Sequence, residues 1–158
     1  MTQPESKLLL LGLGLVLAGF ARQAAAHCQV PCGIYDDQAR FAAKLEDTAT
    51  VAKAIGQIGE LAGTHDANGH NQLARWVVTK EEHASSIQQT IADYFMAQRI
   101  KADADNYVDL LKSAHAVTVG AMKAKQAADP ATADTLEAAI KKLYEVYYGK
   151  AYQKAHVH

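Results

Sequence analysis

A helical spacing of apolar residues runs through most of the chain and constrains its fold more than any other feature. From Asp37 onward, such residues recur every three or four positions, which places them on one face of an α-helix. Four stretches of this kind follow one another, and no strand pattern competes with them. The stripe positions are Phe41, Leu45, Thr48, Ala52, Ile55 and Ile58; Leu73, Trp76, Val77, Ala84, Ile87, Ile91 and Tyr94; Tyr107, Leu110, Leu111, Ala114, Val117, Ala121 and Met122; and Leu136, Ile140, Leu143, Tyr144 and Tyr147. The sequence therefore predicts an all-α fold.

Capping and breaking residues mark the ends of the predicted helices. Asp36 or Asp37 is available as the N-cap of the first helix, and Gly63 with the polar turn after it ends that helix. Asp129 and Pro130 place a capping acid before a first-turn proline at the start of the fourth helix. These signals predict short connections between helices of similar length.

Helices of similar length with short connections pack best as antiparallel neighbours. We therefore expect residues 37–158 to form one antiparallel, up-down-up-down four-helix bundle. The stripes of Leu, Ile, Val and Ala that build such a bundle are common to many proteins, so the fold alone implies no function. Function has to come from residues outside the helical pattern.

The first 26 residues have the three-part layout of a secretory signal peptide. Residues 1–7 are short and polar, residues 8–20 form an apolar run, and three alanines at 24–26 form an A-x-A cleavage site before His27. The apolar run is shorter than the roughly 20 residues that a membrane anchor needs. We expect residues 1–26 to be cleaved, and the protein to be exported, periplasmic or secreted, with no stable membrane anchor after processing.

Composition limits the partners of the predicted mature chain. Removal of 26 of the 158 residues leaves 132, an ordinary size for one domain with a single core. Taking away Glu5, Lys7 and Arg22 leaves 14 basic and 16 acidic residues, a formal charge of −2, and no block of basic residues. This balance argues against a nucleic-acid surface and favours a small-molecule partner.

Residues 27–36 carry the unusual chemistry, and we call this segment the hook. It contains both cysteines of the chain, Cys28 and Cys32, together with His27, whose α-amine becomes free on cleavage. That amine has a pKa of about 8, so its coordination to a metal costs little at neutral pH. The amine, the backbone nitrogen of Cys28 and the two sulfurs make a planar N2S2 set, which suits divalent nickel or copper, whereas zinc prefers a tetrahedron.

Two further motifs accompany the hook sequence His-Cys-x-x-Pro-Cys-Gly-x-Tyr: Asp93-Tyr94-Phe95, and Asp129-Pro130-Ala131-Thr132. Together they resemble nickel superoxide dismutase, a family whose fold is a four-helix bundle and in which six bundles form a hollow hexamer. The resemblance covers essentially the whole mature chain. It implies a homohexamer that converts superoxide to dioxygen and hydrogen peroxide by cycling between Ni(II) and Ni(III).

The resemblance also implies the site residues. One nickel ion per subunit would be held by the amine and imidazole of His27, the backbone nitrogen and thiolate of Cys28, and the thiolate of Cys32. Tyr35 matches the tyrosine that lines the family's access pocket, and Tyr94 matches a second tyrosine that buttresses it. Taken alone, each tyrosine is more often a packed residue of a helix face.

Some positions depart from the family pattern. Gln29 and Asp37 stand where the family often has Asp and Pro, and we expect both to be peripheral. The family's Glu–Arg pair that orients the axial histidine has no direct counterpart, because the matching positions read Ala42 and Lys80-Glu81-Glu82-His83. Either His83, expected on the inward face with Tyr94, contacts His27, or Glu46 replaces the missing acid. The other histidines, His65, His70, His115, His156 and His158, are assigned no role.

Two readings compete with the enzyme. An exported nickel or copper carrier would use the same hook without enzymatic activity. A structural bundle would instead pair Cys28 with Cys32 in a disulfide, although so small a loop at a chain end gains little stability. Superoxide-dependent redox cycling separates the enzyme from both.

Overall fold

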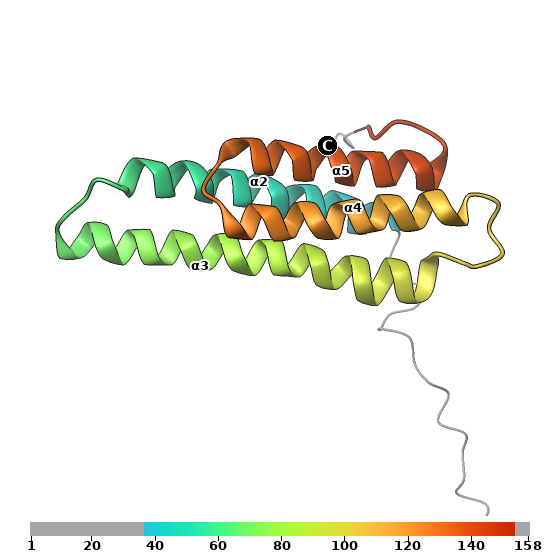
Figure 1. Cartoon of the computed structure of the whole chain (residues 1–158), viewed down its shortest axis with the longest axis horizontal. Coiled ribbons are helices and arrows are strands. Elements are labelled where there is room, and N and C mark those ends of the chain that lie inside the picture. Colours follow the sequence, from blue (N-terminus) through green and yellow to red (C-terminus); the bar gives the residue numbers. More distant parts are fainter. Residues whose placement is uncertain (1–36, 154–158) are drawn as a thin grey trace, which may run out of the picture. The chain divides into compact units, whose positions relative to one another are not determined.

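The computed structural model describes residues 37–153, and in that range it contains helices and no strands (Figure 1). Helix α3 runs directly into the π-helix η1, so the chain forms four long helical segments. Their bounds are α2 (Asp37–Leu61), α3 (Ala67–Thr90) with η1 (Ile91–Arg99), α4 (Tyr107–Gln126) and α5 (Pro130–Tyr148). The all-α prediction is confirmed for this part of the chain.

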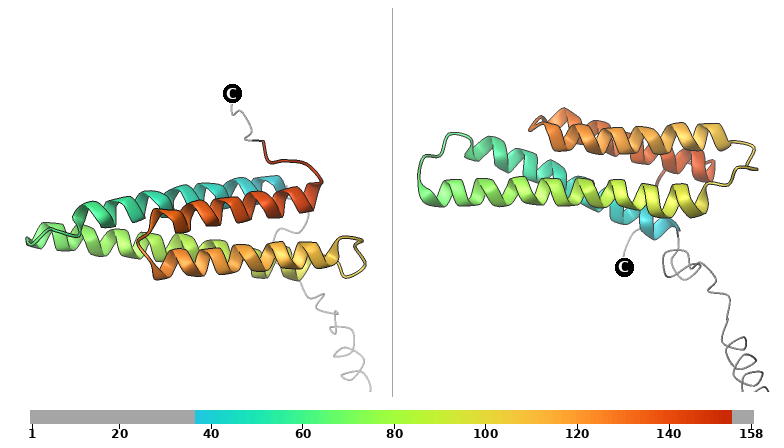
Figure 2. Two further views of the ribbon diagram at one scale, coloured as in Figure 1. Left: turned by 45° about the horizontal axis from the view of Figure 1, so that its top comes forward. Right: turned by 60° about the horizontal axis from the view of Figure 1, so that its bottom comes forward.

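Each helix packs against two others around one shared core. Helix α2 contacts α3 and α5, and α4 contacts the same two helices (Figure 2). The core combines apolar side chains from all four segments, and burying them is the main favourable contribution to folding. Its largest fully buried members are Phe41, Val51, Ile55, Ile87, Ile91, Phe95, Val117, Leu136, Ile140 and Leu143.

Three positions predicted to face the core lie on the surface instead. Ala52 is exposed while its neighbour Val51 is fully buried, so the buried stripe of α2 lies one residue away from the predicted one at this point. Val77 and Met122 are 39% and 40% exposed. Helices α2 and α3 reach beyond α4 and α5 at the end near residues 62–66 (Figure 1), so α3 has fewer neighbours there than a uniform stripe implies.

Local signals set the helix boundaries. Asp66 is the N-cap of α3 and accepts a hydrogen bond from Gly69 N–H at 2.8 Å, and a Cβ at Gly69 would lie 2.4 Å from Thr64 Oγ1. Asp129 caps α5 as predicted, because its carboxylate accepts from Ala131 N–H at 3.0 Å. In residues 37–153, no helix has the length and apolar character needed to span a bilayer.

A buried lysine closes the C-terminal end of α4. Lys80 on α3 is 5% exposed, and its Nζ donates to the carbonyls of Ala124 at 3.1 Å, of Ala127 at 3.2 Å, and of Lys125. Carbonyls at a helix C-terminus have no partner within the helix and carry partial negative charge. The ammonium group satisfies these acceptors and joins α3 to the end of α4.

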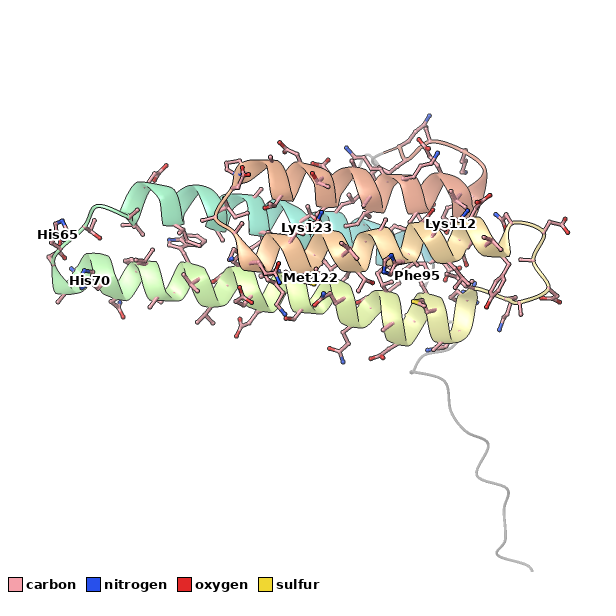
Figure 3. The ribbon with its side chains drawn as sticks, in the orientation of Figure 1. His65, His70, Phe95, Lys112, Met122 and Lys123 are labelled. Carbon is pink, nitrogen blue, oxygen red and sulfur yellow. The ribbon has the colours of Figure 1, made fainter. Side chains whose placement is uncertain are left out.

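We predict that Lys80→Ala lowers the free energy of unfolding by about 2 kcal/mol or more, because it leaves buried carbonyls without a charged donor. Urea unfolding followed by circular dichroism measures this. Lys123→Ala, an exposed lysine of α4 labelled in Figure 3, is the matched control and should change stability by less than about 0.5 kcal/mol. Equal effects of the two substitutions would contradict the capping role of Lys80.

Candidate metal centre and its supporting side chains

The predicted metal ligands and the described structure adjoin in the sequence. His27, Cys28, Cys32 and Tyr35 lie outside the described residues, and Asp37, the first described residue, follows Cys32 by five positions. Within residues 37–153, no group of three or more His, Cys, Asp or Glu side chains is arranged to hold a metal ion. The described residues that follow the predicted ligands in the sequence are those at the start of α2.

Asp37 is the centre of a four-residue hydrogen-bonded cluster, which we call the Asp37 cluster. Its Oδ1 accepts from Tyr94 Oη at 2.5 Å. Its Oδ2 accepts from Tyr147 Oη at 2.7 Å and from Arg99 through Nη2 at 2.5 Å and Nε at 3.1 Å. Asp37 is only 8% exposed, so its side chain, and not only its backbone, takes part in the packed structure. That it is peripheral to the metal ligands stays a prediction. The cluster joins the start of α2 to η1 and to the last turn of α5.

The π-helix explains how Tyr94 and Arg99 reach the same carboxylate. They are five residues apart, a spacing that separates two side chains widely around an α-helix. A π-helix pairs residue i with residue i+5, which brings them to one side, one turn apart. The bond from Ile100 N–H to the Phe95 carbonyl, at 2.8 Å, continues this pairing to the end of η1. The wider turn thus supplies two of the three donors to Asp37.

An aromatic group packs beside the carboxylate. The ring of Phe95 lies 5.3 Å from that of Tyr94 and 5.8 Å from that of Tyr147, and Phe41 lies 4.6 Å from Phe95 between ring centroids. Phe41 and Phe95 are essentially fully buried. Figure 3 labels Phe95 among the side chains of this region. Such apolar surroundings strengthen the hydrogen bonds of the cluster and make loss of any one partner costly.

Electrostatics in the cluster keep the acid ionised and the phenols protonated. Burial disfavours the charged form of Asp37, but hydrogen bonds from Arg99, Tyr94 and Tyr147 and the charge of Arg99 outweigh it and lower its pKa. Burial and the bond to Asp37 raise the pKa of Tyr94 and that of Tyr147 to about 12. At neutral pH both phenols therefore keep their protons and donate them to the carboxylate.

A second polar group links α2 and α3 through Asp47. His83 Nδ1 lies 2.7 Å from Asp47 Oδ1, while Asp47 Oδ2 lies 2.5 Å from Lys44 Nζ and accepts from Ser86 Oγ at 3.2 Å. Glu46 is exposed. The acid beside His83 is thus Asp47, and with a side chain 37% exposed His83 is not the inward residue that its spacing from Tyr94 predicted.

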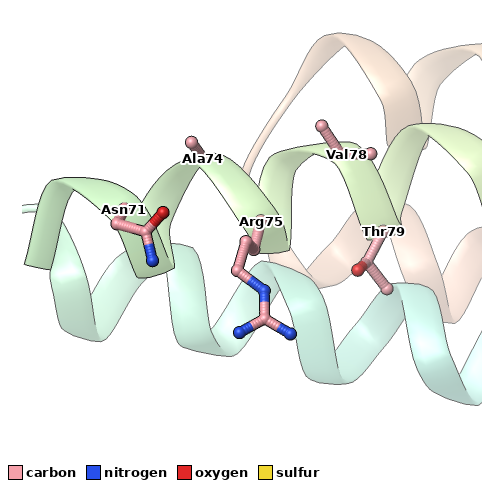
Figure 4. A pocket seen from close by; sticks show the side chains of 5 residues that line it. All are labelled: Asn71, Ala74, Arg75, Val78 and Thr79. Atoms are coloured by element: carbon pink, nitrogen blue, oxygen red, sulfur yellow. The ribbon is translucent and has the colours of Figure 1, made fainter. Parts of the chain in front are cut away.

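Other features of the described surface stay outside these two groups. His65, His70 and His115 are exposed, and Figure 3 shows the first two at the turn between α2 and α3. His156 and His158 lie outside the described residues. A shallow pocket (Figure 4) is lined by α3 side chains alone: Asn71, Ala74, Arg75, Val78 and Thr79.

Comparison with known proteins decides the family. The family model of nickel-containing superoxide dismutase matches residues 22–151, which includes the hook and all four described helical segments. The chain belongs to the nickel-containing superoxide dismutase family. Searches of curated proteins and of solved structures gave no match. The protein is thus an oxidoreductase with a nickel cofactor and superoxide as its substrate, and the resemblance noted from the hook sequence is confirmed.

The donors expected in this superoxide dismutase fit nickel chemically. The hook offers two soft thiolates, an imidazole and backbone nitrogens within six residues, and the expected cleavage before His27 would add an amine. Sulfur and nitrogen donors of this kind suit divalent nickel better than the oxygen-rich sets that bind magnesium or calcium. Nickel therefore agrees with both the family and the residues present in the chain.

Sequence reasoning missed most of the Asp37 cluster. Arg99 and Tyr147 carried no assigned role, although Tyr147 was placed correctly on the stripe of the last helix. Arg99 and Tyr147 lie 62 and 110 positions from Asp37 in the sequence, so no local pattern predicts their hydrogen bonds to it. Two sequence features could have indicated the cluster. Tyr94 and Arg99 lie five residues apart at the end of a helical stripe, and the acidic residue Asp37 begins another helix.

The pKa shifts predict how stability depends on pH. Because the pKa of Asp37 lies below its ordinary value of 3.8, its contribution is present above about pH 4 and disappears as pH falls through the lowered value. The pKa values of Tyr94 and Tyr147 are raised from 10 to about 12, so their contribution is lost between these pH values. Urea unfolding across both ranges should show the acid loss reduced in Asp37→Asn and the alkaline loss reduced in Tyr147→Phe. Parallel profiles for variants and parent would contradict this account.

Proposed function

We propose that this superoxide dismutase binds one nickel ion per subunit at the N-terminus that cleavage after Ala26 creates. The ligands are the amine and imidazole of His27, the backbone nitrogen and thiolate of Cys28, and the thiolate of Cys32. The observation that carries this proposal is the His27–Tyr35 hook sequence, which lies inside the region matched by the family model. The exported carrier without enzymatic activity is less favoured, because the matched family is one of enzymes.

The proposed chemistry is one-electron transfer in two half-reactions. When bound, nickel would supply a one-electron Ni(II)/Ni(III) couple, with which one superoxide could be oxidised to dioxygen and a second, on taking up two protons, reduced to hydrogen peroxide. The thiolates of Cys28 and Cys32 and the backbone nitrogen of Cys28 donate the electron density that makes the higher oxidation state accessible. The imidazole of His27 completes the ligand set in the oxidised state.

The two tyrosines have different proposed roles. Tyr35 lines the approach to the metal and offers a hydroxyl to substrate or water. Tyr94 supports that approach from the side, because its own proton is donated to Asp37 and its raised pKa of about 12 holds that proton in place. Its oxygen keeps lone pairs that accept hydrogen bonds.

We also propose an assembly and a location. Short connections at residues 62–66, 100–106 and 127–129 support an antiparallel, up-down-up-down bundle, as does the contact of each helix with two others. A homohexamer is supported by the family resemblance and by exposed apolar side chains that an interface would cover, namely Val77, Val78, Met96, Val108 and Met122. The layout of residues 1–26 supports export to the periplasm or beyond the cell.

We predict that Cys28→Ser and Cys32→Ser each abolish nickel binding and dismutase activity but leave the helical content nearly unchanged, because the ligands precede the bundle. Metal analysis, superoxide decay after pulse radiolysis and circular dichroism measure the three quantities. Gln29→Ser is a matched control in the same segment, because its side chain is not among the proposed ligands, and it should keep nickel. Retained nickel and activity in both cysteine variants would refute the ligand assignment.

We predict that one extra alanine before His27 strongly weakens nickel binding and removes activity. The added residue converts the α-amine into an amide and moves the imidazole away from the chain end, so two donors are changed while all side chains remain. The extended chain and the authentic start are compared for nickel content, thiol titre and superoxide removal. Full activity of the extended form would exclude the amine as a ligand.

A further inference from the structure

We propose that four tyrosines near the C-terminal end of the described chain form a one-electron relay that ends at the hydrogen bond between Tyr147 and Asp37. In spatial order its members are Tyr152, Tyr144, Tyr148 and Tyr147. The relay passes an electron from Tyr147 to a surface tyrosine that a radical oxidant has attacked, and Asp37 accepts the proton that Tyr147 loses. It is separate from the proposed dismutase reaction and uses only residues that the structure describes.

The four phenol rings form an unbroken series of contacts. The ring centroids of Tyr152 and Tyr144 lie 5.0 Å apart, and those of Tyr144 and Tyr148 lie 4.6 Å apart. The last step, from Tyr148 to Tyr147, is also 5.0 Å. These separations are typical of packed aromatic pairs. Since a phenol is one of the most easily oxidised side chains and rings in contact exchange electrons rapidly, an electron can pass along the whole series.

The outer end of the series is accessible and the ring next to it is not. Tyr152 lies after α5, where the chain turns back along that helix (Figure 1), and it is partly exposed. Tyr144, the next ring inward, is only 2% exposed. A radical in solution therefore reaches Tyr152 directly but reaches Tyr144 only through its neighbours. Tyr148 and Tyr147 are partly exposed as well, so an oxidation that begins at either ring has the same end point.

The bond to Asp37 makes Tyr147 the end of the relay. Loss of an electron turns a phenol into a strong acid, so oxidation is favoured where a base takes the proton at once. Asp37 Oδ2 lies 2.7 Å from Tyr147 Oη. Burial raises the pKa of Asp37, but the bonds and charge of its partners, Arg99 first among them, lower it further, so the carboxylate is ionised and able to accept. An oxidised phenol is a stronger acid than a carboxyl group, so the lowered pKa does not prevent the transfer.

Tyr94 shares the same carboxylate but lies outside the tyrosine series. Its hydroxyl donates to Asp37 at 2.5 Å, and its ring contacts that of Phe95 at 5.3 Å. Phe95 in turn contacts the ring of Tyr147 at 5.8 Å. A phenylalanine ring is much harder to oxidise than a phenol, because it has no hydroxyl oxygen to donate electron density and no acidic proton to release. The series of tyrosines therefore stops at Tyr147.

The overall step balances atoms and charge. A one-electron oxidant such as the carbonate radical anion takes one electron and becomes carbonate. Tyr147 supplies that electron through the series and becomes a neutral phenoxyl radical, while its proton moves to Asp37, which becomes a neutral carboxylic acid. Each tyrosine in between regains the electron that it passed on. One electron from a small reductant such as ascorbate, together with the proton on Asp37, then restores the phenol and the carboxylate.

The experiment exposes the full chain to carbonate radicals, made by pulse radiolysis of a bicarbonate solution, and compares substitutions that keep side-chain shape. Tyr144→Phe interrupts the series, Tyr147→Phe removes its end, and Asp37→Asn removes the proton acceptor. Tyr107→Phe is the matched control, because Tyr107 is a partly buried tyrosine of α4 that contacts no other aromatic ring among the described residues. Mass spectrometry of the C-terminal peptide gives the oxidised fraction of Tyr152, and optical absorption and electron paramagnetic resonance give the lifetime of the tyrosyl radical.

We expect Tyr144→Phe and Tyr147→Phe to raise the oxidised fraction of Tyr152 several-fold, because the oxidised ring can no longer recover an electron from the far end of the series. Asp37→Asn should also raise it and should shorten the lifetime of the radical, because Tyr147 then loses an electron without a base to take its proton. In deuterium oxide the radical should form more slowly in the parent chain than in water. Tyr107→Phe should match the parent in all these measurements.

Two results would overturn the inference. One is a parental oxidised fraction of Tyr152 in both Tyr144→Phe and Tyr147→Phe, which would reduce the four tyrosines to packing of the core. The other is an Asp37→Asn chain that matches the parent in Tyr152 oxidation and in radical lifetime, which would exclude the carboxylate as the proton acceptor. Circular dichroism checks folding, and if Asp37→Asn does not fold, the two tyrosine variants still decide, because neither removes a charge.

Discussion

The ionised carboxylate of Asp37 is the interaction on which the organisation of this end of the molecule depends. A buried carboxylate is stable only when its charge is balanced and its oxygens are hydrogen-bonded. Arg99 meets the first requirement, and Arg99, Tyr94 and Tyr147 together meet the second. Because these donors belong to η1 and α5, the carboxylate links the positions of α2, η1 and α5 at this end.

The π-helix carries two of the three donor residues. A regular α-helix continuing α3 would bring Tyr94 or Arg99 to Asp37, but not both at once, because a five-residue spacing places them on different faces. The nine residues of η1 form a wider turn than an α-helix, and this turn brings the two donor residues to one side of the helix. π-helical turns are rare and occur frequently at functional sites. Here the turn supplies two of the three residues that donate to the carboxylate at the start of α2.

Periodicity was sufficient to predict the four helical segments but not the polar groups between them. Phe41, Ile87, Val117 and Leu136 could be placed in the core from spacing alone, because apolar side chains on one helix face have one way to be buried. Lys80 could not be recognised as buried, since its partners are carbonyls 44 to 47 residues away that become available only at the end of α4. Burial of charge depends on tertiary neighbours, which a single sequence does not display.

The candidate site likewise has residues that can be proposed from the local sequence and others that depend on tertiary contacts. The proposed metal ligands could be named from the sequence because they lie within six consecutive residues, where chemistry and spacing are both local, and their assignment stays a prediction. The side-chain bonds of Asp37 were not predicted, because its position was compared with a proline in the family pattern, which suggested that only its backbone matters. A proline at such a position restricts the chain through its ring, whereas an aspartate restricts it through hydrogen bonds to distant elements. The restriction by the aspartate acts on the start of α2 and depends on Arg99, Tyr94 and Tyr147 all being present, so its strength comes from the whole group and not from the aspartate alone.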